Sequence, residues 1–184
     1  MLTGFGTQTA GVTCGGSSPS VGPNLTTSEE YDGTNWSTGG TMNSARTAMQ
    51  SGGTGNANAI VAGGYNASHT PYRTASESYN GTAWTEVADL NVARRQNTGG
   101  AGLTNTSALN FGGDDPQTAS TELWDGTSWT TTSSMATGRR QLGSANASPS
   151  SASLAFGGTP PASNATEEFT AGTSVTTAST LTTS

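Results

Sequence analysis

One phrase of sequence occurs four times along the 184-residue chain. In each copy a short apolar run ends in two glycines, a loop of variable sequence follows, and then comes an acidic residue with an aromatic residue two positions later. The double glycines begin at Gly15, Gly63, Gly112 and Gly157, which gives spacings of 48, 49 and 45 residues. Repeats of this length are typical of structural units that stack against one another. The chain therefore predicts four similar units.

Aromatic residues hold fixed positions in the second half of each repeat. The acidic residue and its aromatic neighbour are Glu29 and Tyr31, Glu77 and Tyr79, Glu122 and Trp124, and Glu167 and Phe169. Five residues after the aromatic one stands Trp36, Trp84 or Trp129, and in the fourth copy Val175 takes this place after one extra residue. We expect these large side chains to fill the space between neighbouring units.

Each repeat divides into four short strands, which in the second copy we expect at 46–51, 58–62, 75–79 and 84–87. In every copy the residues one and three positions before the double glycine are apolar: Cys14 and Val12, Ala62 and Ile60, Phe111 and Leu109, Phe156 and Leu154. Alternation with a period of two is typical of a strand with one face turned to a core. Between the third and fourth strands, Asp-Gly or Asn-Gly predicts a two-residue type I′ hairpin with positive φ angles.

Four antiparallel strands in a meander cannot bury both faces of their sheet alone, so neighbouring repeats must pack against it. The sequence therefore predicts an all-β fold, a β-propeller of four four-stranded blades in a single domain, 1–184. The blades span about 1–45, 46–93, 94–138 and 139–184. The register of the repeats favours a compact four-bladed ring. The alternative is four blades of a larger ring, completed by a second copy or by further sequence.

The order of residues in each copy resembles the kelch repeat: an arginine near the first strand, two glycines after the second, a tyrosine before a turn and a tryptophan opening the fourth strand. Three of the four copies hold two glycines, an aromatic residue and a tryptophan at these positions, with tyrosine as the aromatic residue in two of them, and the resemblance covers essentially the whole chain. It implies four-stranded blades around a central axis, usually six or seven of them. The Asp-Gly-Thr-x-Trp phrasing, with few charges and no lysine, is also similar to kelch-like structural proteins of bacteriophages and marine viruses.

Composition excludes several classes of function. The net charge of −6 and the absence of lysine make nucleic acid an unsuitable partner. No apolar run reaches the ~20 residues of a membrane span, so we expect none. Cys14 is the only cysteine and is expected to be buried and inert. His69 is the only histidine, which leaves neither a catalytic triad with a nucleophile motif nor a set of metal ligands. We expect no enzyme activity and no cofactor.

All six arginines belong to one face of the predicted fold, at the connections between repeats or in a loop after the second strand. Two uses for them stay open. One is a ring of partly buried glutamate–arginine pairs, one per blade. The other is an anion or sugar site at the mouth of the axis, lined by Arg46, Arg94 and Arg139.

The loops after the double glycines differ in every copy, and variation on a constant framework indicates a surface for specific contacts. The loop of the second repeat is the richest. Its candidate binding residues are Tyr65, His69, Tyr72 and Arg73. The alternative interpretation is that loops simply tolerate change.

The missing catalytic residues and the repeats together predict a non-enzymatic structural or binding module. The setting we expect is a virion surface or tail appendage of a phage-like particle, hence an extracellular one. Its partners would be other virion proteins or a host glycan, and the chain could also form a homo-oligomer. Two alternatives stay open: a kelch-type protein interaction scaffold and a carbohydrate-active enzyme.

Overall fold

A computed structural model describes residues 2–18, 24–66, 73–96, 100–114, 117–145, 149–159, 162–171 and 179–180. Within these ranges the chain forms β-strands and no helix, and the strands assemble into four four-stranded antiparallel sheets. In each sheet every strand pairs with the next along the chain. The prediction of an all-β fold built from four-stranded meanders is confirmed. No helix in the described ranges has the length and apolar character that a membrane crossing requires.

Each repeat supplies one sheet. The first contains β1 (Thr3–Thr7), β2 (Ala10–Cys14), β3 (Ser28–Tyr31) and β4 (Trp36–Thr38). The second contains β5 (Gln50–Gly53), β6 (Ala59–Ala62), β7 (Ser76–Tyr79) and β8 (Trp84–Val87). The third contains β9 (Gly100–Thr104), β10 (Ser107–Phe111), β11 (Thr121–Trp124) and β12 (Trp129–Thr132). The fourth contains β13 (Gly143–Ser144), β14 (Ala152–Phe156), β15 (Ala165–Thr170) and β16 (Ser179–Thr180).

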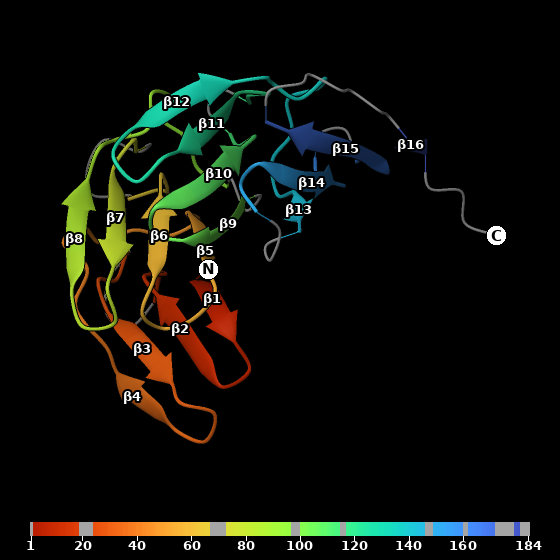
Figure 1. Cartoon of the computed structure of the whole chain (residues 1–184). Helices are drawn as coiled ribbons and strands as arrows, with labels where there is room; N and C mark the ends of the chain where they lie inside the picture. The colour runs from red at the N-terminus through yellow and green to blue at the C-terminus, as the bar shows by residue number, and fades with distance from the viewer. Residues whose placement is uncertain are drawn as a thin grey trace.

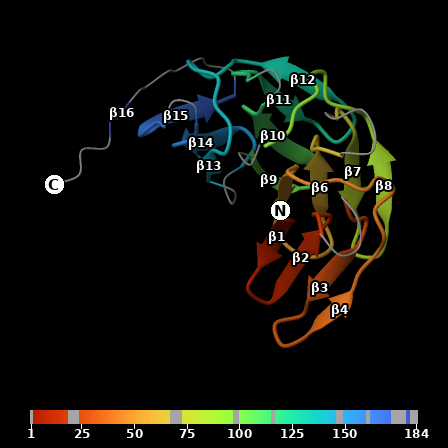
Figure 2. The same ribbon diagram turned by 180° about the vertical axis from the view of Figure 1, so that it is seen from behind.

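The four sheets stand side by side like the segments of an open fan (Figure 1). The first strand of each sheet lies toward the middle of the fan, and β4, β8 and β12 lie at its rim, as the opposite view also shows (Figure 2). Along the inner side β1 contacts β5, and β5 contacts β9. The sheets therefore follow chain order around the fan.

The first strand of the second repeat starts later than the sequence predicted. It begins at Gln50 rather than at Arg46, whereas the other three strands lie within a residue of the expected bounds. The cause is Ala48, whose φ of 54° interrupts the extended backbone between an isolated bridge at Thr47 and the strand proper. Gln96 and Gln141 hold the same conformation in the third and fourth repeats, with φ of 52° and 55°.

The turn between the third and fourth strands is longer than predicted. Tyr79 pairs with Trp84, so four residues rather than two form the connection. Only Gly81 has a positive φ, 93°, and the Asn80 side chain accepts hydrogen bonds from the amides of Thr82 (3.0 Å) and Ala83 (2.9 Å). The type I′ prediction was wrong because Asn and Asp act here through their side chains and not through positive φ.

A core cluster lies at each of the three junctions where one sheet packs on the next. Between the first and second sheets, Val12 and Cys14 pack with Val61, Tyr79 and Trp84. Burial in this cluster raises the pKa of Cys14 to about 12, so the thiol stays protonated and unreactive. The next cluster repeats the arrangement between the second and third sheets, and its members are Ile60, Ala62, Leu90, Ala108, Trp124 and Trp129.

A third cluster joins the third and fourth sheets through Leu109, Phe111 and Ala155, with Leu123 and Phe169 packed against it. Each sheet therefore turns the apolar residues before its double glycine toward the following sheet. It turns its aromatic residues toward the preceding one. The alternation of apolar residues in β2, β6, β10 and β14 predicted this packing of one strand face against a core.

The described residues form an open arc rather than the compact ring that we favoured. Trp36 in the first sheet is 54% exposed, whereas Trp84 and Trp129 are 6% and 5% exposed. At the other end of the arc, Leu154 and Phe156 are 37% and 44% exposed. The outer faces of the first and last sheets thus have no neighbouring sheet among the described residues.

Candidate functional site

Three arginine–glutamate pairs lie at the sheet junctions. Nη2 of Arg46 lies 2.5 Å from Oε1 of Glu77, the same atoms of Arg94 and Glu122 are also 2.5 Å apart, and Arg139 pairs with Glu167. All six side chains are almost completely buried. The structure therefore contains the predicted glutamate–arginine pairs in the second, third and fourth repeats. Glu29, the equivalent residue of the first sheet, is exposed.

Each buried carboxylate is held by further donors from the segment before its arginine. Glu77 accepts hydrogen bonds from the backbone amide (2.8 Å) and the side-chain amide (3.0 Å) of Asn43, and from the amide of Ser44 (3.2 Å). Asn91 makes the same two contacts with Glu122. Sequence reasoning missed these asparagines, although an asparagine three residues before the arginine in two copies was a signal.

The arginines also join consecutive sheets through the backbone. Nη1 of Arg94 donates to the carbonyl oxygens of Gly112 (3.0 Å) and Ser120 (2.8 Å), both near the ends of strands in the third sheet. The carbonyl of Arg94 accepts from the amide of Gly64 (2.8 Å), at the end of a strand in the second. Gly64 has a φ of 106°, which glycine adopts without strain. The second glycine of the pair thus donates a backbone hydrogen bond to the segment that leads into the next sheet.

Burial sets the chemistry of these arginines. It lowers the pKa of Arg46, and the charge of Glu77 opposes that shift. Burial likewise lowers the pKa of Arg94, and here Glu122 is the opposing charge. Because Arg46, Arg94 and Arg139 are 0–1% exposed, their guanidinium groups serve the junctions and present no surface to a ligand.

A second set of arginines lies beside the buried ones and is partly exposed. We call Tyr65, Arg95, Asp114 and Arg140 the arginine cluster. Oδ2 of Asp114 lies 3.6 Å from Nη2 of Arg95 and 2.5 Å from Nη1 of Arg140. The guanidinium carbon of Arg95 lies 5.2 Å from the ring centre of Tyr65, within the range of a cation–π contact. The side chains of Arg95 and Arg140 are 28% and 33% exposed.

The backbone explains why the second arginine of each Arg-Arg pair takes this place. Arg95 forms an isolated bridge with Asp114, and Arg140 forms one with Thr159, so successive side chains point to opposite sides of an extended segment. Hydrogen bonds then link the following residues from sheet to sheet: Gln96 N donates to Ala48 O, and Gln141 N donates to Gln96 O, both at 2.9 Å. The cluster therefore sits on a fixed framework that spans three sheets.

The candidate loop residues are only partly placed. Tyr65 is half-buried and belongs to the cluster, and Arg73 is half-buried with its amide donating to Gly64 O (3.2 Å). His69 and Tyr72 lie outside the described residues. Sequence reasoning placed all four arginines of the two Arg-Arg doublets at connections between repeats, but it chose Arg94 and Arg139 as binding candidates and not Arg95 and Arg140. Among the described residues, no group of three or more His, Cys, Asp or Glu side chains is arranged to hold a metal ion.

The arginine cluster suits an anionic or hydroxyl-rich ligand. Two guanidinium groups face one described carboxylate, and a planar guanidinium can bind a second carboxylate through two hydrogen bonds. An aromatic ring beside them offers a flat surface for a sugar or a side chain. Comparison with protein-family models and with curated proteins finds no match for this chain, so the kelch resemblance stands on the repeated residues alone.

Proposed function

We propose that the chain is a non-enzymatic binding and structural module, built as kelch-like blades of a propeller, which contacts its ligand through the arginine cluster. The repeats support the blade architecture, because each copy yields one four-stranded sheet that packs on the next. The setting we propose is the surface or a tail appendage of a phage-like virion, where such a module contacts a host glycan or a neighbouring virion protein.

The observation that carries the proposal is the partly exposed pair of guanidinium groups beside a tyrosine ring. In a chain of net charge −6, these two arginines concentrate positive charge at one place on an otherwise acidic molecule. Such a patch attracts and orients an anion. A glycan that carries carboxylates fits this chemistry, because it offers the anion to the guanidinium groups and a sugar ring to Tyr65.

Binding of acidic and neutral oligosaccharides, measured by calorimetry, tests the proposal. We expect saturable binding of an acidic oligosaccharide that Arg140→Gln weakens by about 1.5–3 kcal/mol, the range for hydrogen bonds to charged groups. Thr85→Glu, on the exposed part of β8, changes the net charge by the same amount away from the cluster and serves as the control. Binding that Arg140→Gln and Thr85→Glu weaken equally would contradict a site at the arginine cluster.

A further inference from the structure

The two ends of the arc carry sheet faces that no described part of the chain covers. We call the side of the first sheet with Tyr31 and Trp36 the leading face, and the side of the fourth sheet with Leu154, Phe156 and Glu168 the trailing face. Both views place the first sheet, β1–β4, and the fourth, β13–β16, at opposite ends of the fan (Figures 1 and 2). The other sheets have the same two sides, and we use the same names for them. Inside the arc, the trailing face of each sheet is covered by the leading face of the next sheet. The uncovered faces are therefore the two halves of one more junction of the same kind.

A tryptophan-to-hydroxyl hydrogen bond marks the first two junctions. The indole nitrogen of Trp84 donates to Ser28 Oγ in the preceding sheet (3.3 Å), and that of Trp129 donates to Ser76 Oγ (3.1 Å). The serine always stands one residue before the repeated glutamate. On the trailing face this position is Thr166, which also has a hydroxyl, and on the leading face the free tryptophan is Trp36.

The residue after the repeated glutamate is matched to the aromatic residue that meets it. Glu30 accepts a hydrogen bond from the hydroxyl of Tyr79 in the following sheet. At the third junction the equivalent residues are Leu123 and Phe169, which are both apolar and both pack against the same core cluster. Within the described ranges, the residues at these positions that meet no residue of another sheet are Glu168 on the trailing face and Tyr31 on the leading face. They are the same two residue types as Glu30 and Tyr79.

The second junction follows the rule with a neutral residue. Ser78 stands at the position of Glu30, and the aromatic residue is Trp124, whose indole nitrogen donates within its own sheet to Asn105 O (2.7 Å). No acidic acceptor is therefore required there. The acidic Glu30 meets a tyrosine and the apolar Leu123 meets a phenylalanine, so a hydroxyl donor is the partner that matches Glu168.

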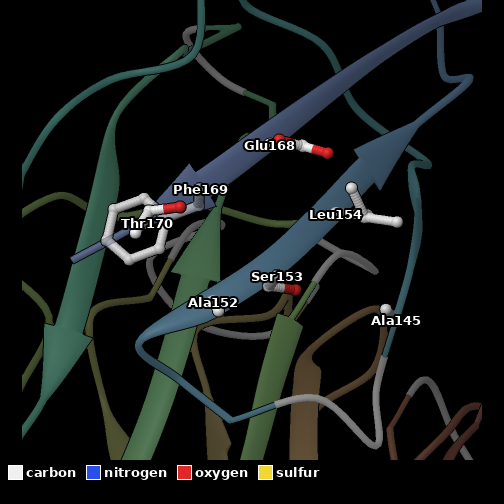
Figure 3. A pocket seen from close by; sticks show the side chains of 7 residues that line it. All are labelled: Ala145, Ala152, Ser153, Leu154, Glu168, Phe169 and Thr170. Carbon is white, nitrogen blue, oxygen red and sulfur yellow. The ribbon is translucent and has the colours of Figure 1, made fainter. Parts of the chain in front are cut away.

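The trailing face also contains a hollow of about 360 Å³, lined by Ala145, Ala152, Ser153, Leu154, Glu168, Phe169 and Thr170 (Figure 3). Glu168 pairs directly with Leu154, and Figure 3 shows them next to each other on β15 and β14. In the first sheet the place of Ala145 is taken by Phe5, whose ring meets Trp84 edge-on at 6.4 Å. The smaller alanine leaves space beside Leu154 where the first sheet has an aromatic ring.

We propose that the leading face of a second copy of this chain docks on the trailing face. Trp36 covers Leu154 and Phe156 and donates to Thr166, and Tyr31 donates to Glu168. Each copy offers both faces, and in this proposal two arcs related by a two-fold axis form two identical junctions and close into one ring of eight sheets. The inference goes beyond the proposed ligand site and does not depend on it, because no residue of the arginine cluster takes part.

The mass of the chain in solution is the primary test, measured by sedimentation equilibrium over a wide range of concentration. We expect twice the chain mass for the wild type. Trp36→Ser on one face and Leu154→Asp on the other should each weaken the dimer by roughly 30-fold or more, as for a central interface residue. Both side chains are exposed in the single chain, and circular dichroism verifies that each variant is folded. A wild-type mass that stays at one chain, or keeps rising with concentration, overturns the proposal.

Mixing the two variants distinguishes this docking from other dimers. A Trp36→Ser chain keeps its trailing face and a Leu154→Asp chain keeps its leading face, so the mixed pair retains one intact junction. We therefore expect the mixture to dimerise more strongly than either variant alone. A dimer made from two leading faces would be insensitive to Leu154→Asp and would gain nothing from mixing, and either result overturns the proposal.

A swap of the matched residues tests the contact itself. Tyr31→Phe leaves Glu168 without its donor, and Glu168→Leu leaves the tyrosine hydroxyl without its acceptor, so each should weaken the dimer. The double variant recreates the apolar pair of Leu123 and Phe169 and should dimerise more strongly than the two single effects combined predict. Strictly additive effects would show that the two residues do not meet.

Discussion

The inner and outer sheets are built from the same phrase of sequence, yet their aromatic residues have different environments. In the second sheet Trp84 stacks on Tyr79, with ring centres 4.7 Å apart, and is buried under the first sheet. In the first sheet Trp36 packs on Tyr31 in a similar way, at 5.1 Å, but its outer surface faces solvent. The contact within a sheet is therefore fixed by local sequence, whereas burial is decided by the neighbouring sheet.

The burial of the repeated glutamates also differs between the sheets. Glu77 is buried and accepts four hydrogen bonds, all of them from the segment that leads into its own sheet. Glu29 also follows a serine and stands two residues before a tyrosine, but it is exposed. A carboxylate can be buried only where an arginine and several amides converge on it. Differences in stability between the inner and outer sheets are to be measured in the Phe156→Asp background, so that docking of a second copy does not contribute.

The largest contrast is expected between Glu77→Ala and Glu29→Ala. The first change leaves the buried guanidinium of Arg46 and the amides of Asn43 and Ser44 without their acceptor, so we expect a loss of about 3–5 kcal/mol. The second removes an exposed side chain and should change stability by less than about 0.5 kcal/mol. Urea unfolding followed by tryptophan fluorescence measures both. Equal effects would show that the buried pairs do not hold the junctions.

A smaller contrast is expected between Trp129→Phe and Trp36→Phe. The first change removes the indole donor to Ser76 inside a buried junction and should cost about 1–3 kcal/mol. The second should cost less than about 0.5 kcal/mol, because Trp36 has no neighbouring sheet. The midpoint of urea unfolding compares them. A cost at Trp36 as large as that at Trp129 would mean that the leading face is covered within one chain.

The smallest contrast concerns the turns, which are alike in inner and outer sheets. Hydrogen bonds from the amides of Ser128 and Thr127 lower the pKa of Asp125 below its ordinary 3.8, and Asn80 makes the equivalent bonds without a charge. The stabilisation by Asp125 is therefore complete above its unfolded pKa and is lost as the pH falls through the lowered value.

We therefore expect Asp125→Asn to cost a little stability at neutral pH and nothing in strong acid. Thermal unfolding of wild type and variant at a series of pH values measures the difference. A difference between them that stays the same at every pH would contradict the contribution of the charged form.

Much of the fold could be predicted from the sequence because the four copies of the repeat show which positions keep the same type of residue. The alternation around Ile60 and Ala62 placed β6, and the aromatic spacing placed β7 and β8. The start of β5 could not be predicted, because the positive φ of Ala48 has no sequence signature. It is held by contacts between sheets, in which the carbonyl of Ala48 accepts a hydrogen bond from Gln96.

The sequence predicted a face for the candidate site but not the members of the arginine cluster. From the order of the strands we predicted that all six arginines lie on one face. Which arginine of Arg94-Arg95 is buried did not, because both occupy a connection without regular pairing. Glu122 decides it, since its carboxylate lies within reach of one guanidinium and not of the other.

By itself, the sequence determined the four sheets, their order and the residues that each turns toward its neighbours, because period-two alternation and turn residues act over a few positions. Only the tertiary structure decided that the arc stays open, which arginines are buried and which are exposed, and that Trp36 and Leu154 lie uncovered. These outcomes depend on how far each sheet is rotated from the last. That rotation is the sum of many contacts between residues distant in the chain, and no single repeat encodes it.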